Sequence, residues 1–452
     1  MSAIRFKRLV LNDLEDWRSS ENRKPLVLRG ARQVGKTVAA RMFGKTYNHF
    51  AEMNLETKEH SALFQRIRKP AEIIQAVKLL KGIPPKEKEW LLFLDEIQAC
   101  PEAVASLRYF YEDIPEVHVL AAGSLLETAL QKKHISFPVG RVDFRYLYPM
   151  SFEEFLGALG NSNIKEVFQE VPSPAYAYDQ LLSFFHQYAL VGGFPEAVAR
   201  YAETRDITAV NQVYESLFSA YIDDVSKYAR NTTMTHILKH CLKSAPAEAG
   251  TRIKFAGFGS SNYGSREIGE ALRTLEQVML LSLLYPTVST SAPFLPNMRK
   301  SPRLQFVDTG LMQYLAGTQQ DLIGIDDLSA VFRGRILEQL TGQELMSRYS
   351  AVRRAPLFWV RNKPQSQAEL DFLDVRGTMP VPVEVKSGSE GKLRSLHRFM
   401  EMQQNAEMAI RLYRGTFIDQ TVQRAGRQFR LLNVPYYHAS KVGEYCDPGW
   451  WK

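Results

Sequence analysis

Short apolar runs followed by helical patterns organise the first 150 residues of the chain. Residues 26–29 form one such run, and the pattern after them keeps helical spacing up to Gly44. Residues 91–94 and 117–122 are further runs, apolar enough for strands that are buried on both faces. Buried strands that alternate with helices predict an α/β domain over residues 1–150.

Helical spacing dominates residues 151–230, with three amphipathic stretches at 152–159, 178–190 and 210–228. The run 190–195, which holds two glycines and a proline, interrupts this pattern and requires a tight turn. Such a turn is either simple punctuation or the hinge of a helical lid. We predict a helical lid over residues 151–230.

Helical patterns at 234–244 and 265–281 come before β-rich segments around 283–288 and 304–307. Helices followed by a β-hairpin are the order of a winged helix. Residues 231–318 are therefore predicted to form a winged-helix-like domain.

Near the C-terminus, residues 368–373 and 381–385 are strand-like and are joined by a turn at Gly377. Pro382 lies inside the second segment and cannot donate a ladder hydrogen bond, so we expect it on an edge or a bulge. The fourth predicted domain covers residues 319–452.

Composition agrees with several globular domains and excludes a disordered chain. The 452 residues are 45% hydrophobic and 23% charged, and about 150 residues per domain gives roughly three domains as a floor. The net charge is +8. Most of it lies between Arg230 and Arg303, where ten Lys and Arg face four Glu. The bias is either a solvated basic face or a contact with DNA.

Cysteine usage and hydropathy indicate a cytoplasmic protein. Cys100, Cys241 and Cys446 are far apart and in no C-x-x-C pair, which argues against disulfides and a zinc site. The longest apolar stretch, 278–285, is far shorter than the roughly 20 residues that span a bilayer. We therefore expect no membrane partner and no export signal.

A P-loop follows the first apolar run and precedes a helical pattern. Its two glycines let backbone N–H groups surround phosphates, Lys36 can reach the β and γ oxygens, and Thr37 can hold Mg²⁺. The alternative is a glycine-rich turn ahead of a helix. The match to G-x-x-x-x-G-K-[ST] consists of Gly30, Ala31, Arg32, Gln33, Val34, Gly35, Lys36 and Thr37.

Two carboxylates end the second apolar run. In P-loop ATPases the first completes the Mg²⁺ shell and a following glutamate orients the attacking water, so Asp95 and Glu96 are assigned these roles. The alternative is that the pair caps the next helix.

Two further residues are candidates for sensing the nucleotide. Ser124 follows the third run, where AAA+ folds place a polar residue that senses the γ-phosphate, although a helix N-cap is an equal alternative. Arg141 lies in a glycine-containing turn and could stabilise transition-state charge on its own or a neighbouring subunit's nucleotide, against an ordinary ion pair.

A nuclease-type set of residues lies in the C-terminal segment. Alternation puts Glu369 and Asp371 on one face of the first strand, and Glu384 and Lys386 on one face of the second. Asp371 and Glu384 could share a divalent metal ion, while Lys386 activates water or stabilises a developing oxyanion. Glu338, on a helical pattern before the strands, supplies a further acid. This is the pattern of restriction-endonuclease-like folds, the PD-(D/E)xK superfamily; the alternatives are a charged surface hairpin and an inactive nuclease fold.

Seven segments together resemble a family of prokaryotic AAA-type ATPases whose C-terminal half is a domain of unknown function. The resemblance implies an AAA+ core, a helical lid, a winged helix and a restriction-endonuclease-like end. The segments are LVLRGARQVGKT, LLFLDEIQ, AAGSLLE, GRVDFRYLYPMSFEEFL, VGGFPEAV, FVDTGLM and AELDF with VEVKSG.

By position, the resemblance gives Lys36 and Thr37 to phosphate and Mg²⁺, Asp95 and Glu96 to hydrolysis, and Arg141 to the family's Gly-Arg segment. The family's GG-x-P and Asp-x-Gly-Leu segments fall on Gly192, Gly193, Pro195, Asp308, Gly310 and Leu311.

The sequence favours a Mg²⁺-dependent ATPase that acts on DNA and forms nucleotide-dependent homo-oligomers. The alternative is a nucleotide-switched regulator that binds nucleic acid or protein, with an inactive nuclease fold. A small-molecule kinase is disfavoured, because a kinase does not need Glu96 to align water.

Overall fold

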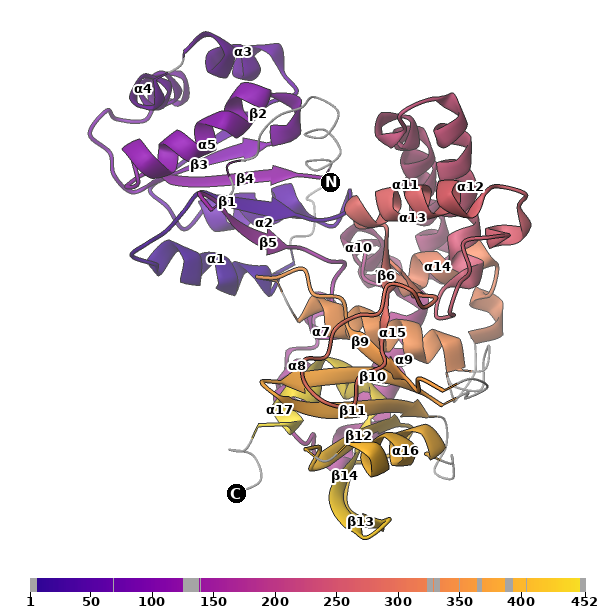
Figure 1. Cartoon of the computed structure of the whole chain (residues 1–452). Helices are drawn as coiled ribbons and strands as arrows, with labels where there is room; N and C mark the ends of the chain where they lie inside the picture. Colours follow the sequence, from indigo (N-terminus) through magenta and orange to yellow (C-terminus); the bar gives the residue numbers. More distant parts are fainter. Residues whose placement is uncertain are drawn as a thin grey trace. The chain divides into compact units, whose positions relative to one another are not determined.

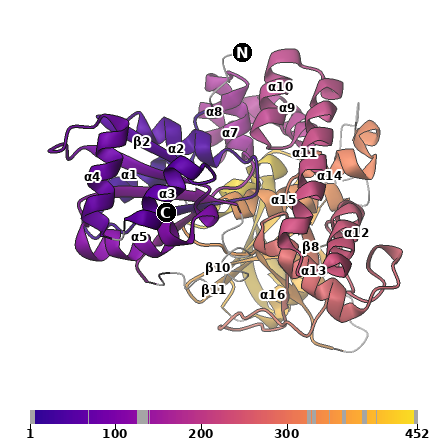
Figure 2. The same ribbon diagram turned by 90° about the horizontal axis from the view of Figure 1, so that it is seen from above.

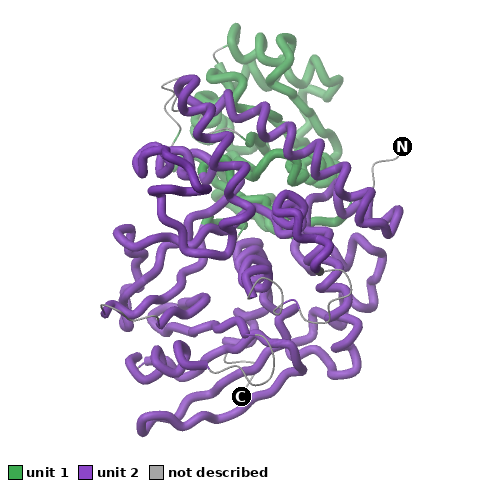
Figure 3. Tube along the Cα trace, turned by 90° about the vertical axis from the view of Figure 1, so that its right-hand side faces the viewer, with its two compact units in different colours: residues 1–148, 277–279, 349–353 green, residues 149–276, 280–348, 354–452 purple. Residues whose placement is uncertain are grey.

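The computed structural model describes residues 6–67, 69–124, 138, 140–322, 328, 334–348, 350–363, 368–386, 393–403 and 405–447 (Figure 1). The chain divides into two compact units (Figure 3). The first holds residues 1–148, 277–279 and 349–353, and the second holds residues 149–276, 280–348 and 354–452.

A five-stranded parallel sheet in the order β2-β3-β4-β1-β5 forms the centre of the first unit. Helices α3, α4 and α5 bury apolar side chains against one face of it, and α2 packs on β3 and β4 (Figure 1). The bounds are α1 (Val10–Ser19), β1 (Leu26–Arg29), α2 (Lys36–Gly44), β2 (His49–Asn54), α3 (Lys58–Arg66), α4 (Pro70–Lys81), β3 (Trp90–Asp95), η1 (Ile97–Ala99), α5 (Pro101–Asp113), β4 (His118–Gly123) and β5 (Asp143–Tyr146).

The three predicted strands are confirmed as β1, β3 and β4. Strands β2 and β5 were not predicted, because both lie at the edges of the sheet and are only partly buried. Their sequences mix polar and apolar residues, which lack the apolar run of a central parallel strand.

Helices make up residues 151–230 of the second unit and continue beyond them. Helices α9, α10, α11, α12 and α14 pack on one another in neighbouring pairs (Figure 2). The bounds are α7 (Phe152–Ala158), α8 (Ser162–Gln169), η2 (Ala175–Ala177), α9 (Tyr178–Val191), α10 (Pro195–Thr204), α11 (Ile207–Tyr228), α12 (Thr232–Glu248), η3 (Phe258–Ser260), α13 (Ser265–Gln277), α14 (Thr309–Ala316) and η4 (Gln319–Leu322).

Two sheets complete this unit. Strands β6 and β8 pair antiparallel, and a larger sheet has the order β13-β14-β12-β11-β10-β9-β7. The remaining bounds are β6 (Leu281–Leu284), β7 (Pro286–Thr287), β8 (Arg303–Phe306), α15 (Arg335–Ser347), β9 (Leu357–Val360), β10 (Glu369–Arg376), β11 (Met379–Lys386), α16 (Arg394–Met402), β12 (Met408–Tyr413), β13 (Ile418–Arg424), β14 (Arg427–Pro435), η6 (Tyr436–Lys441) and α17 (Val442–Tyr445).

Strand β7 belongs to the segment predicted as a winged helix, yet it pairs with β9 of the C-terminal sheet. The division into four domains, and the lid, winged-helix and nuclease-like assignments, stay predictions.

The expectation that Pro382 lies on an edge or a bulge is wrong, because β11 is a central strand between β10 and β12. The ladder with β12 begins at Val383, one residue later, and on the other side Pro382 faces Leu373 without a shift of register. The missing N–H therefore falls where the parallel neighbour has not yet begun to pair.

A buried hydrogen-bond network fixes the turn between α9 and α10. Asp308 accepts from the Gly193 N–H at 2.6 Å and from the Leu311 N–H at 2.9 Å. A Cβ at Gly192, whose φ is +66°, would lie 2.2 Å from Asp308 Oδ1. Burial raises the pKa of Asp308 to about 6. Such a fixed joint favours punctuation over a hinge.

Glu344 joins α15 to the start of the helical region. It is fully buried and accepts from the Phe152 N–H at 3.0 Å and the Tyr188 hydroxyl at 2.9 Å. Burial raises the pKa of this carboxyl to about 7. The folded protein therefore carries an unfavourable buried charge above neutral pH.

The three cysteines are free and buried. Within the described part of the chain, no helix has the length and apolar character needed to cross a membrane. The cytoplasmic location stays a prediction.

We expect Glu344→Gln to remove part of the pH dependence of stability. Because the folded pKa is raised above the ordinary value, folding binds the proton, and the free energy of unfolding falls as pH rises from about 4.5 to about 7. A glutamine still accepts the two hydrogen bonds and stays neutral, which removes a loss on the order of 3 kcal/mol. Denaturant unfolding from pH 5 to 8 measures it. Exposed Glu203→Gln is the control and keeps the wild-type profile; the same profile in Glu344→Gln would contradict the assignment.

Candidate functional site

The P-loop, residues 30–37, follows β1 at the carboxyl edge of the parallel sheet and ends in the first two residues of α2. Gly35 has φ +97°, a left-handed conformation that glycine adopts without strain. At Gly30 a Cβ would lie 2.3 Å from the Leu147 carbonyl oxygen, so no side chain fits there. The glycines of the motif are thus required by the backbone itself.

Lys36 holds this loop together from inside. Its Nζ donates to the carbonyl oxygens of Gly30 at 3.0 Å and Ala31 at 2.8 Å. Burial lowers the pKa of Lys36 to about 8, while the nearby Glu96 and Asp95 carboxylates raise it. The lysine is placed to exchange two carbonyl acceptors for phosphate oxygens.

Thr37 and Asp95 meet although they are 58 residues apart. The Thr37 hydroxyl donates to Asp95 Oδ2 at 2.9 Å, and Asp95 Oδ1 accepts from the Glu96 N–H at 3.1 Å. Strands β1 and β3 are parallel with β4 between them, so their carboxyl ends reach the same edge. Burial raises the pKa of Asp95 above its ordinary value.

Gln98 positions Glu96 and was not found by sequence reasoning. Its Nε2 donates to Glu96 Oε2 at 2.5 Å, and Glu96 itself has φ +50°. A Cβ at Gly123 would lie 2.2 Å from Gln98 Oε1, so Gln98 fills the space beside the end of β4. The only sequence signal was its place two residues after the acid.

Ser124 directly follows β4, whose last residue, Gly123, pairs with Arg29 of β1. It therefore lies at the same edge as the P-loop. The helix that it was alternatively predicted to cap, from residue 125, lies outside the described residues.

Arg141 lies at the opposite edge. Two residues later, Asp143 pairs with Leu26 at the amino end of β1. Arg141 Nε donates to Glu112 Oε1 at 3.0 Å near the end of α5. This position gives no support to a role on its own subunit's nucleotide, and a role on a neighbour's nucleotide stays a prediction.

Arg8 is a second residue that no motif indicated. Its guanidinium donates to the carbonyl oxygens of Val34 at 2.7 Å and Tyr148 at 2.8 Å. The segment directly before α1 is thereby joined to the P-loop.

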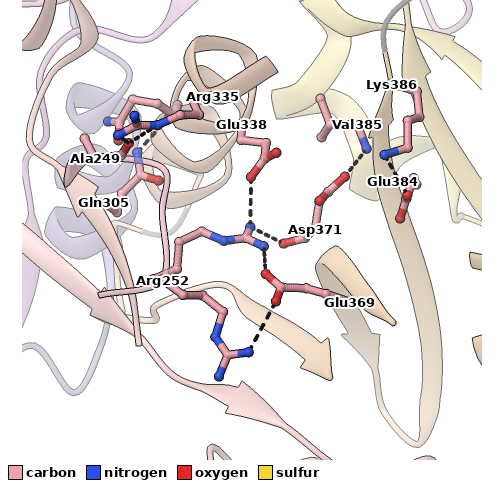
Figure 4. Close-up of polar contacts among 12 residues, drawn as sticks. Ala249, Arg252, Gln305, Arg335, Glu338, Glu369, Asp371, Glu384, Val385 and Lys386 are labelled. Atoms are coloured by element: carbon pink, nitrogen blue, oxygen red, sulfur yellow. Dashed lines mark hydrogen bonds and ion pairs between the residues drawn. The ribbon is translucent and has the colours of Figure 1, made fainter. Parts of the chain in front are cut away.

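The second unit brings the nuclease-type residues together (Figure 4). The predicted hairpin is confirmed: β10 and β11 are antiparallel neighbours with Gly377 in the turn at φ +60°. Glu338 is in the first turn of α15. The alternative of a charged surface hairpin is wrong, because Asp371 is 8% and Glu384 2% exposed.

Lys386 Nζ lies 3.1 Å from Glu384 Oε1, as alternation predicts for residues on one face of a strand. Asp371 Oδ2 accepts from the Val385 N–H at 2.7 Å. Glu384 Oε2 is buried and has no hydrogen-bond partner among the described residues. Burial, with the Asp371 carboxylate second, raises the pKa of Glu338 and of Glu384 to about 8.

Arg303 of β8 inserts a positive charge into this cluster. Its side chain is 3% exposed, lies 2.6 Å from Glu369 Oε1 and 3.6 Å from Glu338 Oε2, and donates to the Asp371 carbonyl oxygen at 2.8 Å. Arg252 contacts the other oxygen of Glu369 at 3.5 Å. Across the described ranges, no three His, Cys, Asp or Glu side chains are arranged to hold one metal ion.

We expect Arg303→Met to destabilise the protein by about 3 kcal/mol, because it removes the buried cation that contacts the carboxyl groups of Glu338 and Glu369. Denaturant unfolding at neutral pH measures the loss. Arg398→Met breaks only the exposed pair with Glu401, 2.9 Å apart, and serves as the control, with a change within about 0.5 kcal/mol. A loss for Arg303→Met no larger than the control's would show that the cluster does not depend on this cation.

Comparison with known proteins divides the chain into three matched regions. Residues 22–156 match the family described as AAA domain. Residues 183–322 and 333–437 match two domains of unknown function, DUF8612 and DUF4143.

An uncharacterized protein of Methanocaldococcus jannaschii is 24% identical over 324 residues, which cover 67% of this chain and 65% of that protein, less than two thirds of its length. Among solved structures, a Walker-type ATPase of Pyrococcus abyssi is 15% identical, covers 69% of this chain and 96% of its own, and has a TM-score of 0.45. The ORC2 protein of Aeropyrum pernix is 13% identical, covers 70% and 93%, and has a TM-score of 0.32.

The matched family, the P-loop and the parallel sheet agree on the first unit. The chain therefore carries an AAA domain at residues 22–156.

Proposed function

We propose that the protein is a Mg²⁺-dependent ATPase that binds ATP at residues 30–37. The contact between the Thr37 hydroxyl and Asp95, at 2.9 Å, carries the proposal. A hydroxyl and a carboxylate that meet beside a P-loop fit the oxygen ligands that Mg²⁺ prefers. Bound there by Thr37 and Asp95, the ion would neutralise charge on the β and γ phosphates.

The chain's own groups then divide the work. Lys36 Nζ transfers its hydrogen bonds from the Gly30 and Ala31 carbonyls to phosphate oxygens. Glu96 orients a water molecule toward the γ-phosphorus, and Gln98 keeps that carboxylate in place. Water forms the new P–O bond as the bond to the β-phosphate oxygen breaks, which yields ADP and phosphate.

Lys36→Ala and Glu96→Gln are each expected to lower phosphate release from ATP by at least about a hundredfold, because each removes a group that acts on the transferred phosphoryl group. A coupled phosphate-release assay with Mg²⁺ measures the rate. Lys45→Ala, an exposed lysine just after α2, is the matched control and keeps the wild-type rate. Wild-type rates of phosphate release in both test variants would contradict the proposal that the protein is an ATPase.

We further propose a nucleic acid, with DNA as the first candidate, as the partner of the region around residues 231–318. The order α12, α13 and the antiparallel pair β6–β8 supports a winged helix. The ten cations against four acids between Arg230 and Arg303 supply the charge. Nucleotide-dependent assembly into a homo-oligomer, with Arg141 acting on a neighbour's ATP, belongs to the same proposal.

A second candidate function, metal-assisted phosphodiester hydrolysis, is favoured by Glu384 Oε2, which has no hydrogen-bond partner in the described part of the chain and lies beside Lys386. Mg²⁺ is commonly held by one or two carboxylates together with substrate phosphates, so Asp371 and Glu384 fit it without a third acid. Such an ion would supply an activated water, and Lys386 would donate to the developing charge. The alternative is a regulator that uses this fold only as a binding platform.

Plasmid and single-stranded DNA with Mg²⁺ or Mn²⁺ separate these two candidates. If the protein is a nuclease, the wild type cuts the DNA, and the Glu384→Ala variant cuts it at least about a hundredfold more slowly. Glu401→Ala, an exposed glutamate on α16, is the control and cuts normally. Salt-sensitive binding with equal, background cleavage by all three proteins would contradict the nuclease and leave the platform.

A further inference from the structure

A groove of about 270 Å³ lies in the second unit, outside both sites described above. Its walls are the segment before α13, the first residue of α13, the residue after β6 and the segment before β8. It is lined by Ile253, Lys254, Phe255, Ala256, Ser265, Tyr285, Met298, Arg299, Lys300, Ser301 and Pro302.

Among the residues that the structure describes, three cations and no carboxylate line this groove. The side chains of Lys254, Arg299 and Lys300 make no ion pair or hydrogen bond with the part of the chain that the structure describes. Two acids of the same region are already engaged, since Glu267 accepts from the Gly264 N–H and Glu276 from the Leu283 N–H. Like charges held together repel one another, so the groove favours an anionic ligand.

Backbone contacts hold the cations in place. The Ile253 N–H donates to the Pro302 carbonyl at 2.8 Å, which joins the two walls that carry Lys254 and Lys300. The Asn297 N–H donates to the Pro286 carbonyl at 2.7 Å, and Asn297 Oδ1 accepts from the Arg299 N–H at 3.0 Å. The three charges therefore lie on a fixed frame.

Apolar and aromatic surface adjoins the charges. Phe255 and Tyr285 are half-buried in the lining. Met298 and Leu295, on the segment between β7 and β8, are 64% and 67% exposed. Cations beside aromatic and apolar side chains match a ligand in which phosphates alternate with flat bases and sugars.

We propose that this groove binds the sugar–phosphate backbone of a nucleic acid. Lys254, Arg299 and Lys300 contact phosphates, and Tyr285 with Met298 contacts the neighbouring sugars or bases. The inference rests on the proposed nucleic-acid partner and assigns the residues that hold it. Because phosphate contacts carry no sequence information, binding depends strongly on salt and little on sequence.

Fluorescence anisotropy with a labelled duplex and a labelled single strand, over a series of salt concentrations, tests the proposal on the full chain. In the triple variant Lys254→Gln, Arg299→Gln, Lys300→Gln, the slope of log K against log salt becomes shallower by about 2.7 on the duplex and about 2.1 on the single strand. The oligonucleotide that the wild-type protein binds more tightly, the duplex or the single strand, identifies the form of the ligand. Arg299→Lys keeps the charge and keeps the slope within about 0.3 of wild type.

Two matched triple variants complete the test. Lys45→Gln, Lys86→Gln, Lys88→Gln removes the same charge from exposed positions of the first unit and leaves the slope unchanged. The second variant, Lys239→Gln, Lys243→Gln, Arg266→Gln, removes the same charge from positions that do not line the groove. ATP hydrolysis and thermal unfolding verify that each variant is folded.

The outcomes separate the inference from the proposed function. A wild-type slope in the groove variant, with binding lost from the Lys239, Lys243 and Arg266 variant, overturns the groove and keeps the nucleic-acid partner. A wild-type protein that binds neither oligonucleotide overturns both. Binding only to vesicles that contain phosphatidylserine, lost in the groove variant, assigns the groove to a lipid surface and overturns the proposal.

Discussion

A buried positive charge is what makes the acidic cluster of the second unit possible. Glu338, Glu369 and Asp371 come from a helix and a strand, and without a cation between them the ionisation of more than one of these carboxyl groups would be opposed in surroundings that screen charge poorly. The Arg303 guanidinium meets all three, two through carboxylates and one through a backbone carbonyl. Its flat face also lies 4.6 Å from the centre of the Phe358 ring. Strand β8, α15 and β10 are therefore held by one side chain, and the placement of Glu338 opposite the β10–β11 hairpin depends on it.

The sites of the two units are formed by different kinds of groups, backbone in the first and side chains in the second. In the first, the P-loop is shaped by glycine backbone and by a lysine that holds two carbonyls, so this loop is local in sequence, while Asp95, Glu96 and Gln98 come from the end of β3 and the turn after it. In the second, the acidic cluster and the basic groove are made of side chains from segments that are distant along the chain. A backbone site tolerates few changes of residue type at its glycines, whereas a side-chain site depends on the fold that brings its members together.

This difference explains how much the sequence could predict. The P-loop, β1, β3, β4 and the β10–β11 hairpin were predictable because spacing and apolar runs are local signals. Edge strands β2 and β5 lack an apolar run, and the central position of Pro382 depends on where β12 begins to pair. Arg8, Gln98 and Arg303 were not predicted, because each acts through long-range or turn-specific contacts that leave no periodicity in the sequence. Arg141 was placed by motif alone, and only the strand register shows which edge of the sheet it occupies.

The joint between Gly192, Gly193 and Asp308 has a consequence for exchanging parts of the protein. The aspartate occupies the space that a side chain at Gly192 would need, and it accepts from the amide of Gly193. The segment with Gly192 and Gly193 and the segment with Asp308 therefore cannot be exchanged independently, although 115 residues separate Gly193 from Asp308. A chimaera that takes α9 and α10 from a relative must also take the start of α14 from the same parent, because a mismatched pair leaves either a clash or an unsatisfied buried carboxylate. The segments that must be exchanged together are thus defined by the hydrogen bond between Gly193 and Asp308, and they lie in two different domains of the sequence-based prediction.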